Sequence, residues 1–199
     1  SGPVNVRWFG AKGDGEADDT AEIAAAIAFS KDIYIPAGTY KVSSTITIPN
    51  AGSVIGEGNH QTVILADSVS GPVFYNGASF TKDQRVKGIR ITGTATTGVQ
   101  FYNCSPGYVG DVTVYGTFDY GFDFSLSFGC TFENISTEGA TIGIAAYRLS
   151  NYFNANNCSH WYTQTSIIPI GVLFDSGNSC AGNVFNNLTL QGCLVGLKT

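Results

Sequence analysis

A period of about 23 residues runs through the second half of the chain and limits what it can fold into. Segments that open with glycine and then alternate in polarity begin at Gly98, Gly121, Gly143, Gly171 and Gly196, at intervals of 23, 22, 28 and 25 residues. A second series lies between them and opens at Gly88, Asp111, Asn134, Asn157 and Asn187, at intervals of 23, 23, 23 and 30 residues. Two interleaved series with one period predict a solenoid, and alternation at every second residue predicts strands rather than helices.

The predicted fold class is therefore all-β, a parallel β-helix with about 23 residues per coil. Leucine-rich repeats have a similar length, but their leucine ladder is missing here. In the glycine series the first and third residues after glycine, such as Val99 and Phe101, are expected to point inward. The asparagines of the second series are expected at a bend, stacked as an amide ladder, because asparagine tolerates left-handed backbone angles.

The first part of the chain differs from the repeats. A short alternating segment, Val4 to Phe9, is followed by glycines and then by a capping-box pattern at Asp19 to Glu22. The alanine-rich run that follows predicts one helix over 19–29. A solenoid needs its first open edge covered, and we expect this helix to cover it.

The motifs of this first part resemble a known family. They are Phe9-Gly10-Ala11-Lys12-Gly13-Asp14-Gly15, Asp18-Asp19-Thr20, Ile33 to Tyr40 and Val54 to Gly58. Over about residues 4 to 66 they resemble the N-terminal part of the pectate-lyase-superfamily β-helix, as in bacteriophage tailspikes, capsule depolymerases and some secreted polygalacturonase relatives. The resemblance implies a right-handed β-helix and, in phage members, a homotrimer on the virion tail that acts on a surface polysaccharide.

The expected organisation follows from the resemblance and the repeats together. Residues 1–66 are interpreted as the N-terminal cap and first coils, and 67–199 as repeating coils of a chain that is a fragment of a longer protein.

Composition excludes several classes of protein. Lys and Arg number only 10, scattered in a chain of net charge −5, so no nucleic-acid partner is expected. No apolar run approaches the about 20 residues of a membrane span, so no membrane insertion is expected. The five cysteines lack CxxC spacing and are interpreted as buried thiols. Gly13-Asp14-Gly15 with Asp18 is interpreted as turn chemistry rather than a calcium loop, and no metal or cofactor is expected.

Candidate site residues come from outward positions one period apart. Tyr115, Glu138 and Trp161 are spaced by 23 and 23 residues, each four residues after the Asp or Asn that opens its repeat. Aromatic rings on either side of a carboxylate suit a sugar chain, so Tyr115 and Trp161 are candidate substrate-binding residues and Glu138 a candidate catalytic acid. The alternative is an exposed ladder that only stabilises the sheet.

Glycosidic hydrolysis usually needs a second carboxyl group. Asp119 and Asp123 are the candidate partners within the chain, and another subunit is the alternative source. Tyr147 and Arg148 are candidate substrate-binding residues, Arg148 for an acidic sugar. His160 falls on an inward register and is expected to be packed. No GxSxG motif is present, which disfavours a serine esterase.

The leading functional hypothesis is a phage tailspike-type protein that binds and degrades bacterial capsule or O-antigen by glycosidic-bond cleavage. Three alternatives stay open: a glycan-binding fragment without a complete active site, a structural β-helix stalk, and a secreted pectin-type lyase or polygalacturonase.

Overall fold

The computed structural model describes residues 2–77, 79–146, 154–161, 170–174, 184–191 and 195–198. In chain order the elements are β1 (Val4–Asn5), the 3-10 helix η1 (Val6–Phe9), β2 (Asp14–Asp18), α1 (Thr20–Phe29), β3 (Asp32–Ile35), β4 (Gly38–Val42), β5 (Ile46–Thr47), β6 (Ser53–Gly56), β7 (Thr62–Tyr75), β8 (Gln84–Gln100), β9 (Gly107–Asp123), β10 (Thr131–Glu133), β11 (Ser136–Ala146), β12 (Asn154–Trp161), β13 (Ile170–Phe174), β14 (Val184–Gln191) and β15 (Val195–Lys198).

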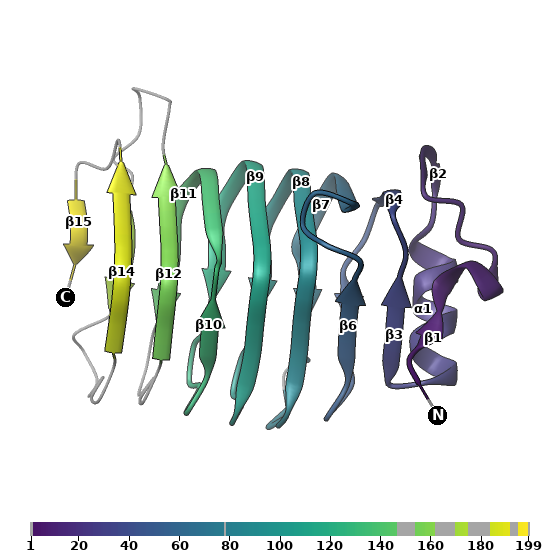
Figure 1. Cartoon of the computed structure of the whole chain (residues 1–199), viewed down its shortest axis with the longest axis horizontal. Helices are drawn as coiled ribbons and strands as arrows, with labels where there is room; N and C mark the ends of the chain where they lie inside the picture. The colour runs from purple at the N-terminus through teal and green to yellow at the C-terminus, as the bar shows by residue number, and fades with distance from the viewer. Residues whose placement is uncertain are drawn as a thin grey trace.

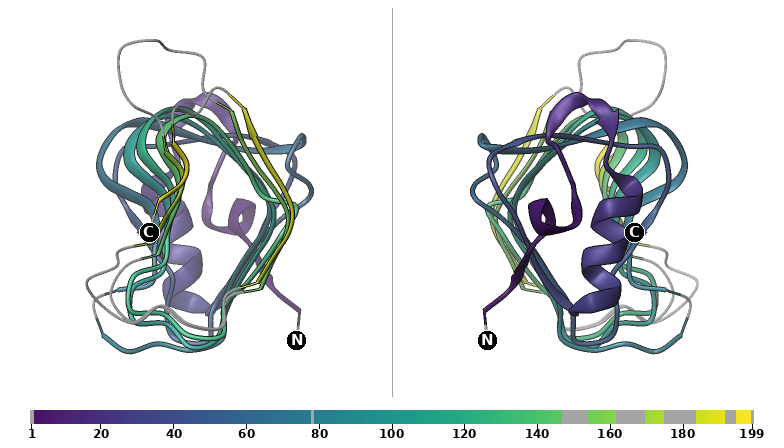
Figure 2. Two further views of the ribbon diagram at one scale, coloured as in Figure 1. Left: turned by 90° about the vertical axis from the view of Figure 1, so that its left-hand side faces the viewer. Right: turned by 90° about the vertical axis from the view of Figure 1, so that its right-hand side faces the viewer.

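These strands stack as successive rungs of a solenoid. Figure 1 shows them side by side along the long axis, and the view along that axis shows the rungs superimposed (Figure 2). The rungs pair in parallel, with Arg85 opposite Tyr108, Tyr108 opposite Thr131 and Thr131 opposite Asn154. The predicted parallel β-helix with one N-terminal helix is confirmed.

The core lies inside the coils. Val99, Phe101, Phe122 and Phe124 are fully buried, as the inward positions of the glycine series predict. The ring centroids of Phe124 and Phe132 are 4.0 Å apart in a stacked arrangement. Each phenylalanine buried in this way contributes about 1.5–3 kcal/mol relative to an exposed one. The repeated inward rows therefore supply the main stabilisation of the solenoid.

The amide ladder forms at the predicted bend. Asp111, Asn134, Asn157 and Asn187 have φ angles of 52°, 53°, 53° and 55°. The Asn134 Nδ2 group donates to Asp111 Oδ1 at 2.9 Å, and Asn157 Nδ2 donates to Asn134 Oδ1 at 3.0 Å. The bond from Asn187 to Asn157 is again 3.0 Å. Each side chain thus binds the next rung at a position whose left-handed backbone suits asparagine.

A glycine ladder at a second bend was not expected. Gly93, Gly116 and Gly139 follow one another at the 23-residue period, with φ angles of 101°, 137° and 87°. A Cβ atom at Gly116 would collide with the carbonyl oxygen of Gly93, and one at Gly139 with that of Gly116. The backbone of neighbouring rungs therefore approaches too closely for any side chain at this bend.

The N-terminal helix begins one residue after the expected start and its capping differs from the prediction. Asp19 is 1% exposed, and its carboxylate accepts hydrogen bonds from the backbone N–H groups of Lys12 and Gly13 at 2.6 and 3.0 Å. Asp18 instead accepts the Thr20 N–H at 3.0 Å. The Asp19 carboxylate therefore closes the glycine loop and makes no side-chain capping bond to the helix. Asp14 likewise accepts from Glu16 and Ala17, which fits turn chemistry.

The described cysteines, Cys104, Cys130 and Cys158, are buried free thiols, as predicted. Burial raises the pKa of Cys158 to about 12. Cys180 and Cys193 lie outside the described residues. Across the described ranges, no group of three or more His, Cys, Asp or Glu side chains is arranged to hold a metal ion. The same ranges contain no helix long and apolar enough to cross a membrane.

Candidate functional site

The predicted row of outward residues forms on three neighbouring rungs. Tyr115 of β9 pairs with Glu138 of β11, and Glu138 pairs with Trp161 of β12. The rungs are about 4.8 Å apart, so the three positions lie in line along the solenoid axis. Tyr115 is 51% exposed and Glu138 is half-buried, while the side chain of Trp161 lies outside the described part. The geometry of the row is thus confirmed at the level of the backbone register.

A groove of about 320 Å³ lies beside this row. Its lining residues are Asn59, His60, Arg90, Thr113, Ser136, Thr137, Glu138 and Ser159. Thr113, Ser136 and Ser159 are in register on successive rungs, and the hydroxyl oxygens of Thr113 and Ser136 are 2.9 Å apart. The floor of the groove is therefore a line of hydroxyl groups parallel to the axis.

One wall of the groove comes from the turn between β6 and β7. The N–H groups of Gln61 and Thr62 both donate to the Gly58 carbonyl oxygen at 2.9 Å, which closes the turn. Asn59 at its tip reaches Thr113, with 3.4 Å between Nδ2 and Oγ1. This contact spans 54 residues of sequence and holds the turn over the rungs.

Arg90 and His60 make the groove electropositive on this side. Arg90 Nη2 lies 2.8 Å from His60 Nδ1, and since a guanidinium has only donors, Nδ1 accepts and the imidazole proton is on Nε2. Arg90 forms no ion pair with any residue that the structure describes, and its Nε is buried without an acceptor there. The guanidinium charge is therefore balanced by a neutral partner alone.

Sequence analysis did not identify Asn59, His60 or Arg90. The repeat pattern could have identified Arg90 as a candidate site residue, because Arg90 lies two residues after Gly88 at an outward position of the second series. No such pattern marks Asn59 and His60, since only the folding of their turn over later rungs brings them to the groove.

Asp123 does not lie at the surface, where its outward position was expected to put it. It is 6% exposed, and its carboxylate accepts from Gln100 Nε2 at 2.8 Å and from the Ser125 hydroxyl at 2.7 Å. These two donors replace water around the carboxyl group. Burial nevertheless dominates and raises the pKa of Asp123 above its ordinary value.

The remaining predicted residues are not brought to the groove. Asp119 is exposed and lines a separate depression with Thr94, Thr117 and Phe118. Tyr147 and Arg148 lie outside the described residues. His160 pairs with Thr137, an inward position that is 3% exposed, which agrees with its predicted register. Of the predicted acids, only Glu138 lines the groove.

Comparison with known proteins agrees with the architecture. Residues 3–95 match the family described as rhamnogalacturonase A/epimerase, pectate lyase-like. Residues 3–95 therefore form a pectate-lyase-like segment of a parallel β-helix. The match ends within β8, and the parallel coils continue beyond it to β15.

Two curated phage proteins are similar to this chain. The pre-neck appendage protein of Bacillus phage phi29 is 28% identical over 232 aligned positions, covering 98% of this chain and 27% of that protein. The capsule K30/K69-specific depolymerase 1 of Klebsiella phage K5-2 is 30% identical over 128 positions, covering 49% of this chain and 16% of that protein. The chain thus spans about a quarter or less of the length of these relatives.

Among solved structures, the catalytic domain of a GH87 α-1,3-glucanase superimposes with a TM-score of 0.73 at 18% identity, over 99% of this chain and 36% of that one. At this identity the similarity establishes the shared fold only.

Proposed function

We propose that this β-helix is part of a phage appendage that binds a bacterial surface polysaccharide and cleaves its glycosidic bonds in the groove beside Glu138. The observation that carries the proposal is the placement of one carboxyl group among a line of hydroxyls, a cation and an exposed aromatic ring. The phage relatives, a pre-neck appendage protein and a capsule-specific depolymerase, support the same class of function.

The groove suits an extended sugar chain that runs along the solenoid axis. Successive rungs present hydroxyls from Thr113, Ser136 and Ser159, which hydrogen-bond to sugar hydroxyls. The Tyr115 ring offers a flat apolar face beside this line. Arg90 adds a positive charge whose polar partner among the described residues is the neutral His60, so the groove favours a polysaccharide that carries acidic groups.

Cleavage would use Glu138 as one of the two carboxyl groups that glycoside hydrolysis needs. The structure brings neither Asp119 nor Asp123 to the groove, so we propose that the second carboxyl comes from a neighbouring subunit of a homotrimer. Sedimentation of the full-length protein tests the trimer, and a monomer would remove this source.

The test is reducing-end release from a panel of bacterial capsular and O-antigen polysaccharides. Glu138→Gln should abolish turnover and leave binding largely intact, because the amide keeps the shape but cannot transfer the proton. Glu16→Gln, at an exposed glutamate outside the groove, is the matched control and should retain turnover. Unchanged turnover in Glu138→Gln rules out the catalytic role. Ultraviolet absorbance of an unsaturated product would identify a lyase instead of a hydrolase.

A second candidate function is glycan binding without cleavage. It is favoured by one observation, that Glu138 is the sole carboxyl group among the described residues that line the groove. Wild-type binding to a polysaccharide without any release of reducing ends or unsaturated product would select this candidate.

A further inference from the structure

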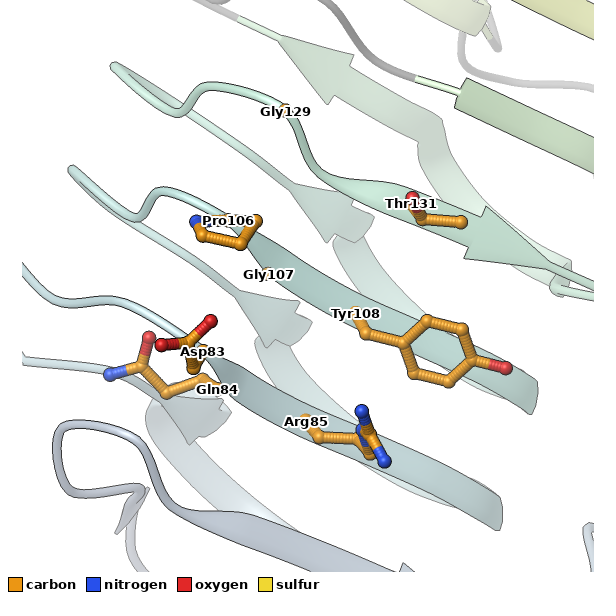
Figure 3. Close-up of a pocket in the computed structure, with 8 residues that line it drawn as sticks. All are labelled: Asp83, Gln84, Arg85, Pro106, Gly107, Tyr108, Gly129 and Thr131. Atoms are coloured by element: carbon orange, nitrogen blue, oxygen red, sulfur yellow. The ribbon is translucent and has the colours of Figure 1, made fainter.

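A second pocket lies on a different face of the solenoid, where β8, β9 and β10 begin (Figure 3). Its volume is about 170 Å³, and Asp83, Arg85, Tyr108, Gly129 and Thr131 contribute to its lining. Arg85, Tyr108 and Thr131 are in register on three successive rungs. The bend that carries the Asp111–Asn134 ladder separates this face from the groove beside Glu138. The two sites are therefore structurally independent.

Tyr108 is held in one position on this face. Its phenol lies across Gly110, where a Cβ atom would collide with the ring and its oxygen. The hydroxyl donates to Glu133 Oε2 at 3.1 Å, and the Arg85 guanidinium carbon is 5.3 Å from the ring centroid. Burial and the bond to Glu133 raise the pKa of Tyr108, so the phenol remains a hydrogen-bond donor. A ring fixed on both sides loses little conformational entropy when a ligand binds against it.

Small residues keep the space beside this ring open. Gly129 and Thr131, two small residues, line the pocket on the rung after Tyr108 (Figure 3). Asp83 and Arg85 are exposed at the pocket, and neither forms an ion pair within the part of the chain that the structure describes. The pocket thus combines the Tyr108 ring, the exposed Asp83 carboxylate and the Arg85 guanidinium that lies over the ring.

We propose that this pocket is a second carbohydrate site, which binds a single neutral sugar unit. Asp83 and Arg85 carry opposite charges two residues apart, and the Glu133 carboxylate is already engaged by the Tyr108 hydroxyl, so the pocket favours a neutral ligand. Sugar hydroxyls both donate and accept, so adjacent hydroxyls can donate to Asp83 and accept from Arg85. The C–H groups of the sugar ring pack against Tyr108. The volume suits one sugar unit better than a large ligand.

The experiment titrates the whole chain with the methyl glycosides of glucose, galactose, mannose and rhamnose, observed by NMR at the Tyr108 ring resonances. We expect at least one glycoside to bind with a dissociation constant of about 1 mM. Thr131→Phe fills the pocket without removing a proposed contact, and aromatic residues are favoured in strands. It should weaken binding at least ten-fold.

Tyr34→Ala is the matched control, since Tyr34 of β3 is a half-exposed tyrosine outside the pocket. It should bind the glycoside as the wild-type chain does. The proposal is overturned if no glycoside shifts the Tyr108 resonances or if Thr131→Phe binds as tightly as wild type. It is also overturned if the free amino acid glycine, added as a separate ligand, binds the pocket and the glycosides do not. Because polysaccharide cleavage depends on the groove, a negative result here leaves the proposed function standing.

Discussion

Asp123 and Glu138 are carboxyl groups on neighbouring coils whose environments differ. Asp123 at the end of β9 is buried beside two uncharged donors, whereas Glu138 of β11 is half-exposed in a groove with a cation. Burial disfavours the ionised form, so Asp123 lowers stability when it ionises. Glu138 remains accessible to a ligand.

We predict that Asp123→Asn changes the pH dependence of unfolding. The pKa of Asp123 is raised in the folded chain above the ordinary 3.8, so its contribution to the free energy of unfolding falls as pH rises from about 3.8 through the raised value. The asparagine variant lacks this loss, so its stability relative to wild type should increase as the pH rises above about 3.8. Urea unfolding of both proteins at several pH values measures the difference. A constant difference between the two across these pH values would contradict the prediction.

Arg90 gives a second prediction at the scale of one residue. Arg90→Gln should weaken binding of an acidic polysaccharide by about 1.5–3 kcal/mol, the scale of a hydrogen bond to a charged group. Lys82→Gln removes the same charge from an exposed position outside the groove and should have little effect. Biolayer interferometry with the native polysaccharide and its carboxyl-reduced form measures both. Equal losses in the two variants would assign the effect to net charge alone.

At the scale of the element, the bends hold the coils in register. The asparagine bend uses side-chain bonds between rungs, and the glycine bend uses close backbone contact. Both devices repeat at the coil period, so one substitution affects its own rung and the two beside it.

We predict that Asn134→Ala destabilises the chain more than Asn134→Gly. Both variants lose two ladder bonds, at about 0.5–1.5 kcal/mol each. Alanine must also adopt the φ of 53°, which costs roughly 1–2 kcal/mol and which glycine adopts freely. The free energies of unfolding in urea should therefore rank wild type, glycine and alanine. The reverse order of the two variants would show that the left-handed angle does not govern this bend.

At the scale of the whole molecule, the N-terminal helix covers an otherwise open end of the solenoid (Figure 1). Ile23 is fully buried in α1, and Phe9 of η1 packs against Phe29 with 5.6 Å between ring centroids. An uncovered strand edge or coil end is a template for pairing with other chains.

Ile23→Ala should lower the free energy of unfolding by about 2–5 kcal/mol, because it leaves a cavity under the helix. It should also increase self-association in size-exclusion chromatography. Ile27→Ala, at a half-buried position of the same helix, should have a smaller effect in both measurements. Equal effects of the two variants would argue against a tightly packed cap.

Sequence alone was sufficient for the coil period, the inward rows and the asparagine bend. These features depend on alternation within a strand and on a constant separation between paired residues, and both are visible in a linear pattern. The same constant separation predicted the row of Tyr115, Glu138 and Trp161. The glycine bend at Gly93, Gly116 and Gly139 carried the same signal and was missed.

Only the tertiary structure determined the groove beside Glu138 and the burial of the Asp123 carboxyl group. His60 meets Arg90 across 30 residues, and Asn59 meets Thr113 across 54. Asn59 and His60 belong to a turn that lies outside both repeat series. Asp123 occupies an outward position by pattern, yet Gln100 and Ser125 bond to it and it is buried. Periodicity specifies which side of a strand a residue faces. What covers that side depends on the path of the turns, because a turn folds over the coils according to its own backbone angles and contacts.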